Sequence, residues 1–380
     1  MKTLIVEGWR FLPQSYAVVN SYQCLELLKR QDVALYHRDV PYFDATWRPV
    51  PGLLPVEQEA ALGSIPVPPA GAPADAVLRI DFPHRLDKAA DSDRLCVWAT
   101  TEYKRLLDVA IADGKRPWDA LSRTPATLIA CSNWAAKGLL NSGAPKAKVV
   151  VVPCGVDTSL FRPPTPDERA AARKALGWDG KFVALNVSAM TRNKGIDIAM
   201  KAVAALADRH PTLHLALKGL DSVYSSNRNL GMELKVLSGQ EVRALEGRVA
   251  YQGELMSGAD VVRLYHGADV YLSPYRAEGF NLPVLEAAAC GLPVICTRGG
   301  STEDFVDDSW TLRVDSKEVP EPHRLGEMLE PRFEHLLSQL ERAIQDEAWR
   351  ASASAAGPAW AQERFTWKHS VDKLLRVLFP

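Results

Sequence analysis

Short apolar runs, separated by longer amphipathic stretches, fill the first part of the chain up to Val152. Runs of this length that are rich in Val, Ile and Leu are typical of strands buried on both faces. We predict strands at Thr3–Val6, Val33–Tyr36, Val77–Ile80, Leu95–Trp98, Thr127–Ala130 and Val149–Val152. Apolar residues at helical spacing predict helices at Val18–Leu28 and Tyr103–Ala112. Because parallel strands need crossover connections, this alternation predicts a parallel sheet.

A second series of the same kind follows a turn rich in proline. We predict strands at Phe182–Val187, Leu213–Lys218, Val249–Gln252, Val270–Leu272 and Val294–Cys296. We predict helices at Ile196–Arg209, Ala259–His266, Pro283–Cys290, Thr302–Val306, Arg332–Asp346, Trp349–Phe365 and Lys368–Leu378. Two consecutive alternating series predict an α/β fold with two Rossmann-like lobes and a cleft between them.

Two stretches interrupt the alternation. Arg48–Pro73 is rich in Pro, Gly and Ala, which predicts a long surface loop, and Asp221–Arg248 is a polar insertion. The length of 380 residues agrees with two lobes, because domains average about 150 residues.

Composition narrows the class of protein. The net charge is −1, which gives no overall electrostatic case for binding nucleic acid. The six cysteines never form a C-x-x-C pair, so we expect small buried side chains in a reducing compartment. The N-terminal apolar run is too short for a signal peptide, and no run reaches the ~18 residues of a membrane span. We therefore expect a cytoplasmic protein and leave peripheral contact with the inner face of the membrane open.

The most informative stretch is Ser273–Thr297, where a strand leads through a loop into a short helix. Pro283 suits the first turn of that helix, and Gly291 suits its end, where a positive φ is needed. The amides that precede the helix can bind phosphate or sugar oxygens; they belong to Gly279, Phe280, Asn281 and Leu282.

Two carboxylates flank this helix start. Glu278 precedes the helix, and Glu286 lies about one turn inside it. A carboxylate can accept two hydrogen bonds from a vicinal diol, which suits Glu286 for a ribose and Glu278 for sugar hydroxyls. Taken alone, two glutamates around a short helix are also typical of a solvated face.

The whole string E-G-F-N-L-P-V-L-E-A-A-A-C-G-L-P-V-I resembles the donor signature of retaining GT-B glycosyltransferases of family 4. The resemblance extends to Cys131–Pro163, Ser188–Asp197 and Val249–Pro274. It implies an acceptor-side domain at residues 1–154, completed by a C-terminal helix at 366–380. It also implies a nucleotide-sugar-binding domain at residues 155–365.

The resemblance assigns the donor-side residues. Lys194 matches the lysine that holds the diphosphate, whereas the arginine five positions earlier in the family is Ala189 here. Arg192 is nearby in a different register, so its role as a substitute stays open. The remaining nucleotide-site residues that the resemblance implies are Ser188, Gly253, Glu254 and Leu255. No Asp-x-Asp motif lies in a suitable loop, so we expect no metal ion and no cofactor besides the nucleoside-diphosphate sugar.

The acceptor side falls in the first lobe. Trp9 and Arg10 follow the first strand in an aromatic and polar loop, which suits sugar binding, while packing between the lobes by Trp9 and Phe11 is the alternative. Asp81 and His84 follow the Val77–Ile80 strand, and Glu102 follows the next one. Because parallel sheets present binding residues at the carboxyl ends of their strands, we predict that His84 and Asp81 lie beside the reacting sugar. Ordinary hydrogen-bonding residues are the alternative.

Together these features predict a retaining glycosyltransferase that moves a hexose-type sugar from a UDP- or GDP-linked donor to a hydroxyl group. The acceptor would be a saccharide, a lipid-linked molecule or a small metabolite, in the synthesis of a bacterial glycan, glycolipid or glycosylated metabolite. Three alternatives remain: a GT-B sugar-nucleotide epimerase, a sugar phosphorylase, and a catalytically silent partner subunit. The sequence gives no oligomeric state.

Overall fold

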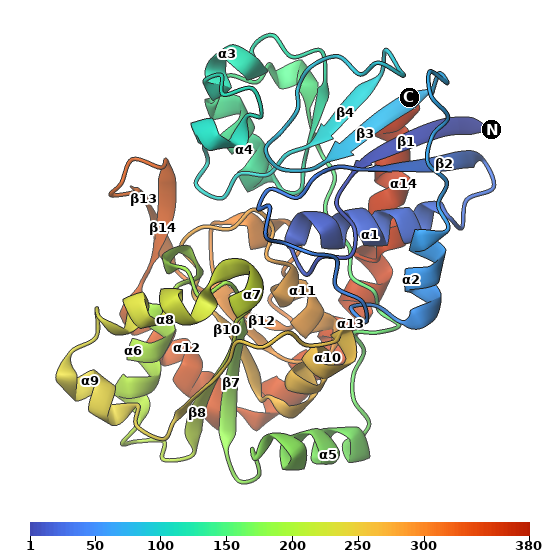
Figure 1. The fold of residues 1–380 in the computed structure, drawn as a ribbon. Helices are drawn as coiled ribbons and strands as arrows, with labels where there is room; N and C mark the ends of the chain where they lie inside the picture. The colour runs from blue at the N-terminus through green and yellow to red at the C-terminus, as the bar shows by residue number, and fades with distance from the viewer. The chain divides into compact units, whose positions relative to one another are not determined.

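The computed structural model describes residues 1–380, and its contacts divide the chain into two units. The N-terminal unit comprises Met1–Gly155, Glu321–Gly326 and Phe365–Pro380. The C-terminal unit comprises Val156–Pro320 and Glu327–Arg364. Each unit contains one six-stranded parallel sheet with helices on its faces (Figure 1).

The sheet of the N-terminal unit has the strand order β2-β1-β3-β4-β5-β6, and all six predicted strands are confirmed. The strands are β1 (Lys2–Gly8), β2 (Val33–Asp39), β3 (Ala76–Ile80), β4 (Leu95–Trp98), β5 (Thr127–Ala130) and β6 (Val149–Val151). The helices are α1 (Ser15–Leu27), α2 (Val56–Gly63), α3 (Pro117–Leu121), α4 (Asn133–Asn141) and α14 (Trp367–Leu378). The rings of Tyr22 on α1 and Trp367 on α14 stack at 5.3 Å, which holds the end of the chain against α1.

Two predictions for this unit were wrong. Tyr103–Ala112 contains only a short 3-10 turn, because Lys104 has a positive φ and the backbone at Ala110 and Ala112 hydrogen-bonds to that of His84. Arg48–Pro73 is not a continuous loop. It holds the helix α2, whose Glu, Gln and Ala residues favour helix formation and whose Leu62 is fully buried.

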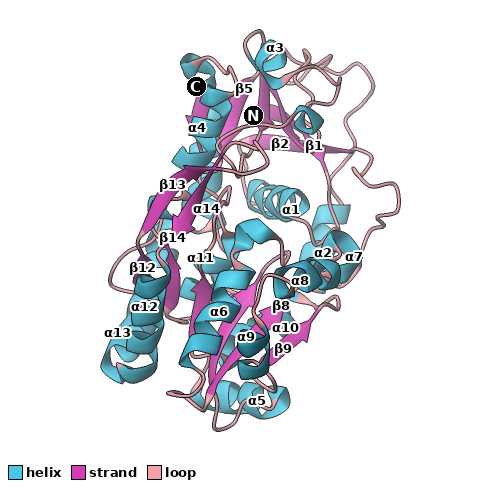
Figure 2. Cartoon of the chain, turned by 90° about the vertical axis from the view of Figure 1, so that its left-hand side faces the viewer, coloured by secondary structure: helices cyan, strands magenta, loops and turns pink.

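The sheet of the C-terminal unit has the strand order β12-β11-β10-β7-β8-β9. Its strands are β7 (Phe182–Val187), β8 (Leu213–Lys218), β9 (Val249–Gln252), β10 (Val270–Ser273), β11 (Val294–Thr297) and β12 (Thr311–Val314). Its larger helices are α5 (Pro166–Leu176), α6 (Ile196–Leu206), α10 (Gly258–Gly267), α11 (Leu282–Ala289), α12 (Phe333–Gln345) and α13 (Glu347–Arg364). Figure 2 shows these helices beside the strands.

The five strands predicted for this unit are confirmed, but sequence analysis missed three others. β12 was overlooked, and so was the antiparallel hairpin of β13 (Ser316–Pro320) and β14 (Glu327–Pro331). The hairpin is rich in Glu and Pro, which are depleted in strands, so propensity gave no signal. The predicted helix at Thr302–Val306 is only a 3-10 turn at Ser301–Asp304.

Both sheets contain a switch point. This is the place between two neighbouring strands from which the chain connections lead outward to opposite edges of the sheet. In sequence order, the C-terminal sheet reads 3-2-1-4-5-6, so its switch point lies between β7 and β10. The N-terminal sheet begins 2-1-3, which places its switch point between β1 and β3. Ligands of such sheets bind outside the carboxyl ends of the strands at these places.

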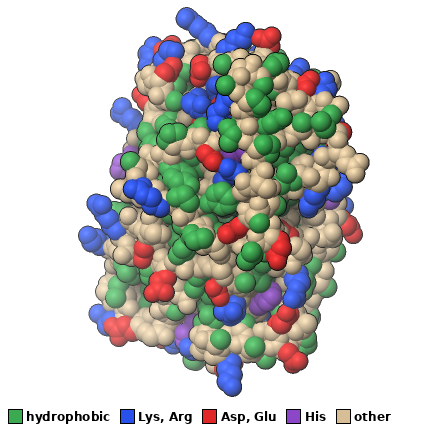
Figure 3. Space-filling model, turned by 45° about the vertical axis from the view of Figure 1, so that its right-hand side comes forward, with side chains coloured by type: hydrophobic (Ala, Val, Ile, Leu, Met, Phe, Trp, Pro, Cys, Tyr) green, Lys and Arg blue, Asp and Glu red, His purple; other side chains and the backbone are tan.

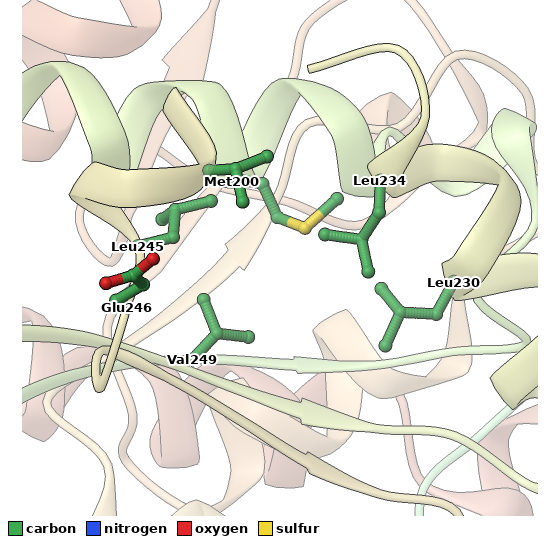
Figure 4. Close-up of a pocket in the computed structure, with 7 residues that line it drawn as sticks. Met200, Leu230, Leu234, Leu245, Glu246 and Val249 are labelled. Carbon is green, nitrogen blue, oxygen red and sulfur yellow. The ribbon is translucent and has the colours of Figure 1, made fainter. Parts of the chain in front are cut away.

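The polar insertion folds against the C-terminal sheet as α7 (Asp221–Tyr224), α8 (Ser226–Leu234) and α9 (Gly239–Ala244). A cavity of about 270 Å³ lies between α8, α9, α6 and β9 (Figure 4). Its lining is apolar apart from one carboxylate and comprises Met200, Leu230, Leu234, Val242, Leu245, Glu246 and Val249. Because ligand sites need several converging polar groups, this lining indicates a packing gap in the core.

The remaining composition-based expectations concern cysteines and charge. All six cysteines are buried free thiols, as predicted. Basic and acidic side chains are interspersed on the face that Figure 3 shows. No helix is both long and apolar enough to cross a membrane.

Candidate functional site

The β7/β10 switch point carries the donor residues that the sequence predicts. The turn after β7 (188–195) and the loop after β10 (274–281) both start at the carboxyl ends of adjacent parallel strands. Asn186, which is fully buried, donates from its side chain to the Leu272 carbonyl and accepts a hydrogen bond from the Ser188 hydroxyl. It therefore fixes the seam between the two strands, a role that sequence reasoning missed.

An ion pair spans this switch point. The Lys194 ammonium lies 3.0 Å from the Glu278 carboxylate, and each side chain is 13% exposed. Gly195, with a φ of 71°, ends the turn that carries Lys194 and starts α6. A side chain at Gly195 would collide with the Pro274 carbonyl, so the two loops pack backbone against backbone.

The start of α11 has the geometry that the sequence predicts. Asn281 caps the helix with a φ of 78°, Pro283 lies in the first turn, and Gly291 follows the helix with a φ of 68°. Amides in a first helical turn have no acceptor within the helix, so those that start α11 can bind a ligand. Only the backbone of Phe280 is available there, because its ring stacks on Phe305 at 4.6 Å.

Glu286 lies on α11 in a largely apolar environment. Burial raises the pKa of its carboxyl group to about 7, although a 2.7 Å hydrogen bond from the Tyr265 hydroxyl opposes this shift. The Tyr265 ring is buried against Phe161 and Tyr271, which fixes the direction of its hydroxyl. Tyr265 is thus a positioning residue for Glu286, and no short motif in the sequence reveals it.

Loops after β8 and β9 complete the donor side of the C-terminal unit. The Lys218 ammonium, which is buried, donates to the backbone carbonyls of Gly219 and Glu254 and so ties the two loops together. Gly253 lies against the Asp221 carboxylate with no room for a side chain. Leu255 is 45% exposed, so its side chain is accessible to a ligand.

Arg276, which the sequence analysis did not select, contacts the turn after β7. Its guanidinium binds both oxygens of Asp197 at 2.7 Å, and it also donates to the Arg192 carbonyl at 2.9 Å. The side chain of Arg192 itself is exposed. Two arginines therefore lie at the turn after β7, although position 189 is an alanine: Arg276 is buried and Arg192 is exposed.

The predicted acceptor residues after β1 are mostly engaged inside the N-terminal unit. Trp9 is 1% exposed, and its indole N–H donates to the Pro41 carbonyl at 2.9 Å. Arg10 is buried and binds both carboxylate oxygens of Asp39 at 2.9 and 2.7 Å. Both side chains are thus engaged within the N-terminal unit, and acceptor binding stays a prediction.

Asp81 and His84 lie across the same switch point, after β3. Burial lowers the pKa of His84 to about 4, against the effect of its contact with the Asp81 carbonyl, so the ring is neutral at pH 7. Burial raises the pKa of Asp81, although its bond to Arg85 at 2.7 Å opposes the shift. One carboxylate oxygen of Asp81 and Nε2 of His84 are buried without a hydrogen-bond partner.

Aromatic rings surround this switch point. The ring centroids of Tyr16 and His84 are 6.0 Å apart. The centroid of Phe43 lies 5.1 Å from that of Phe82 and 6.5 Å from that of Trp47. Phe43 is 50% exposed, whereas Phe82 and Trp47 are half-buried. We call these three rings the aromatic platform. Phe43 and Trp47 lie four residues apart, whereas Phe82 follows β3, so no short motif predicts the cluster. Glu102, after β4, is half-buried and accepts the Trp134 indole N–H at its backbone carbonyl.

The family profile "Glycosyl transferases group 1" matches residues 168–318, which include both loops of the β7/β10 switch point. Residues 168–318 therefore form a domain of this family, as the resemblance predicted. The match covers the Lys194–Glu278 pair, α11 and the loops after β8 and β9, and it ends before α12.

Two characterised relatives illustrate the similarity. The chain is 29% identical over 236 residues to the GDP-mannose-dependent monoacylated alpha-(1-6)-phosphatidylinositol monomannoside mannosyltransferase of Corynebacterium glutamicum, covering 60% of this chain and 55% of the relative. It is 31% identical over 239 residues to the D-inositol 3-phosphate glycosyltransferase of Saccharomonospora viridis, covering 63% of this chain and 51% of that protein. The chain thus spans about half the length of these curated relatives.

Solved structures share the fold over the whole chain. Anabaena HepE, solved with UDP and glucose, superimposes with a TM-score of 0.71 at 15% identity, over 100% of this chain and 99% of HepE. WaaG, a glycosyltransferase involved in lipopolysaccharide biosynthesis, superimposes with a TM-score of 0.64 at 14% identity, over 100% of both chains. The fold of this glycosyl transferase group 1 protein is therefore GT-B, as predicted.

Proposed function

We propose that this chain is a retaining, metal-independent glycosyltransferase that moves a hexose-type sugar from a UDP- or GDP-linked donor to a hydroxyl acceptor. One observation carries the proposal: the Lys194 ammonium and the Glu278 carboxylate meet at 3.0 Å across the β7/β10 switch point. Donor binding there would exchange this ion pair for two sets of ligand contacts. Lys194 would bind the diphosphate, and Glu278 would accept hydrogen bonds from the sugar.

The chemistry follows from these two contacts. The acceptor hydroxyl would attack the anomeric carbon from the face that the diphosphate leaves, and a phosphate oxygen would take its proton. A new C–O bond forms while the bond from the sugar to the diphosphate breaks. Lys194 and the amides at the start of α11 would stabilise the charge that grows on the departing diphosphate.

Glu286 and Tyr265 support binding of the nucleoside part. The Glu286 carboxylate would accept the two ribose hydroxyls, and the Tyr265 hydroxyl would hold it in the required direction. The loops tied together by Lys218 would flank the base, with Gly253, Glu254 and Leu255 on one side. The relatives named above use or act on GDP-mannose and inositol phosphate, which supports a nucleotide-linked hexose but identifies neither base nor sugar for this chain.

The decisive experiment is a donor assay on the purified full chain. Release of nucleoside diphosphate from UDP- and GDP-hexoses is measured with and without candidate acceptors and in the presence of EDTA. We expect slow hydrolysis of one donor, faster release with the right acceptor, and no inhibition by EDTA. The Lys194→Ala variant should lose this release while still folding, as circular dichroism would report.

The assay separates the alternatives. A new hexose epimer formed without acceptor would indicate an epimerase, and a requirement for inorganic phosphate would indicate a phosphorylase. Tight donor binding with no turnover on water or on any acceptor would indicate a silent partner subunit. Inversion at the anomeric carbon, seen by NMR, would contradict retention.

A local surface of the N-terminal unit supports peripheral contact with an anionic membrane, and with it a lipid-linked acceptor. Apolar side chains are exposed there at Val109 (55%) and Trp118 (62%), and Trp118 packs on Gly143 beside the end of α4. Exposed basic side chains lie on the same and neighbouring segments, comprising Arg105, Lys115, Arg116, Arg123, Lys137 and Lys146, of which Lys115 and Arg116 pair with Asp113 and Asp119. Basic and aromatic groups together are typical of surfaces that bind anionic lipid headgroups.

Vesicle flotation tests this contact. The full chain should float with vesicles of phosphatidylglycerol and phosphatidylcholine at low salt, and much less with phosphatidylcholine alone. Trp118→Asp should reduce flotation, whereas an exposed-residue control such as Val67→Asp should not. Equal flotation of all variants, or none with anionic vesicles, would rule out this surface.

A further inference from the structure

Four hydrogen bonds join the turn after β7 (188–195) to the loop after β10 (274–281). The Arg276 and Ala277 amides both donate to the Asn193 carbonyl, at 2.7 and 3.1 Å. The Asn193 side-chain amide donates back to the Ala277 carbonyl at 3.0 Å. The Arg276 guanidinium adds the bond to the Arg192 carbonyl at 2.9 Å. The two residues before Lys194 and the two residues before Glu278 are therefore linked directly.

The Arg276 guanidinium also anchors this assembly to α6. Its two-pronged pairing with Asp197 uses two bonds of 2.7 Å, and both side chains are at least 90% buried. Burial alone would raise the pKa of Asp197, but the bonds from Arg276 lower it below its usual value. Planar two-pronged arginine–carboxylate pairs fix orientation as well as distance.

A second buried carboxyl group makes this arginine more important. Glu233 on α8 is 6% exposed, and one of its oxygens has no hydrogen-bond partner. Burial and the neighbouring Asp197 charge raise the pKa of Glu233 to about 7. Without Arg276, two acidic groups would remain in one apolar pocket next to the turn. Arg192, whose side chain is exposed, would be the nearest remaining positive charge.

We propose that Arg276, held by Asp197, is a positioning residue that sets the place of the Lys194 ammonium relative to Glu278 and hence to the departing diphosphate. The proposal rests on the proposed glycosyltransferase function for its kinetic consequence, but its structural part does not. Arg276 touches no reacting atom; it holds the turn from behind. Because misplacement of a stabilising charge by about 1 Å can lower a rate about a hundredfold, such a residue affects turnover strongly.

The kinetic test compares Arg276→Ala with Arg276→Lys and with Asp197→Asn. We expect Arg276→Ala to lower kcat for donor hydrolysis about ten- to hundredfold. We expect it to weaken nucleoside diphosphate binding more than nucleoside monophosphate binding, because only the diphosphate reaches Lys194. Arg276→Lys should recover part of the loss, since the charge returns without the two-pronged geometry. The Arg276→Ala, Asp197→Asn double variant should lose about as much as either single variant.

Arg173→Ala is the matched control. Arg173 is half-buried, with 15% of its side chain exposed, and also pairs with an aspartate, Asp269, but at the amino end of β10. A merely structural role of Arg276 would make both variants lose stability alike, with the ratio of diphosphate to monophosphate affinity unchanged in each. That result, or normal kcat in folded Arg276→Ala, would overturn the proposal.

Hydrogen exchange keeps the test independent of catalysis. In Arg276→Ala, the amides of residues 191–197 should exchange at least tenfold faster, while those of β7 and β8 stay as in the wild type. If the wild-type chain binds no nucleotide at all, the proposed function fails, and this exchange result alone decides whether Arg276 positions the turn. Unchanged exchange at 191–197 would show that it does not.

Discussion

The two switch points of this chain both lie in parallel sheets, but they carry different kinds of side chains. At β7/β10, oppositely charged side chains meet across the seam, and backbone amides at the start of α11 lie beside them. At β1/β3, aromatic rings surround a neutral histidine, and the nearby charged side chains are tied to each other. A Rossmann-like sheet thus supplies the place for a ligand, while the loop residues decide its chemical class.

This contrast fits a division of labour between the two units. Charges and amides suit a diphosphate, whose negative charge increases as it leaves. Rings and a few buried polar atoms suit a neutral molecule with apolar faces, such as a saccharide or a lipid-linked sugar. Each prediction below alters one switch point and measures an effect that should not come from the other.

The largest expected effect comes from the donor side. Lys194→Ala should lower turnover about a hundred- to a thousandfold, because it removes the cation that stabilises the leaving diphosphate. Steady-state donor hydrolysis measures this loss, with acceptor Km as the control for the other unit. A rate within threefold of the wild type would remove Lys194 from the mechanism.

Glu286→Gln should weaken nucleoside binding about ten- to hundredfold, because the amide can accept fewer hydrogen bonds from the ribose diol. Affinity of the wild type should also fall as the pH drops below about 7, where the carboxyl group becomes protonated. Calorimetric titration with UDP and GDP at pH 6 and pH 8 measures both effects. Equal affinities in both proteins would contradict the ribose role.

The same variant has a second signature in stability. Since the folded pKa of about 7 exceeds the usual 4.5, the folded state holds its proton more tightly, and the wild type loses stability as the pH rises between these values. Glu286→Gln avoids this loss. Its Tm should exceed that of the wild type by several degrees at pH 8 and match it at pH 4.5. A lower Tm at pH 8 would show that Glu286 is not under strain.

Arg192→Ala should have a smaller effect on the donor side. We expect nucleoside diphosphate affinity to fall about three- to tenfold with monophosphate affinity unchanged, because an exposed charge is screened by solvent. This variant sharpens the question left by Ala189. Equal losses for diphosphate and monophosphate would assign Arg192 to the nucleoside rather than to the phosphate.

The smallest expected effect concerns the aromatic platform. Phe82→Ala should raise the acceptor Km about three- to tenfold, because each ring contact contributes about 0.5–1.5 kcal/mol. Donor hydrolysis without acceptor should stay within twofold of the wild type. Tyr36→Ala, which alters a half-buried ring on β2, is the control. A change in donor hydrolysis alone would contradict the division of labour.

The sequence predicted the local geometry around α11 well because it is set by contiguous residues. Glu278, the amides before α11 and Gly291 are set by one short string, and local backbone rules give their geometry. Strands of the parallel sheets were equally readable, since burial on both faces leaves continuous apolar runs. The exceptions were β12 and the β13–β14 hairpin, where the hairpin's Glu and Pro content hid its extended backbone.

The rest depends on contacts between distant segments. Tyr265 reaches Glu286, Arg276 reaches Asp197, and Phe43 reaches Phe82, each only in the folded unit. Their individual side chains are ordinary core or surface types, so no motif distinguishes them. The sequence analysis also expected polar acceptor residues to face a ligand, whereas His84 is buried and Arg10 pairs with Asp39.

Hydrogen exchange on the full chain, with and without saturating nucleoside diphosphate, tests the central claim most directly. We predict that UDP or GDP protects amides in the turn after β7 at 188–195, and in the segment 278–286, which joins the loop after β10 to α11. We also predict protection in the loop 253–255. Peptides from the β1/β3 switch point, at 9–16 and 81–84, should show little direct protection. Protection confined to the β1/β3 loops, or none at the Lys194–Glu278 pair, would contradict the account.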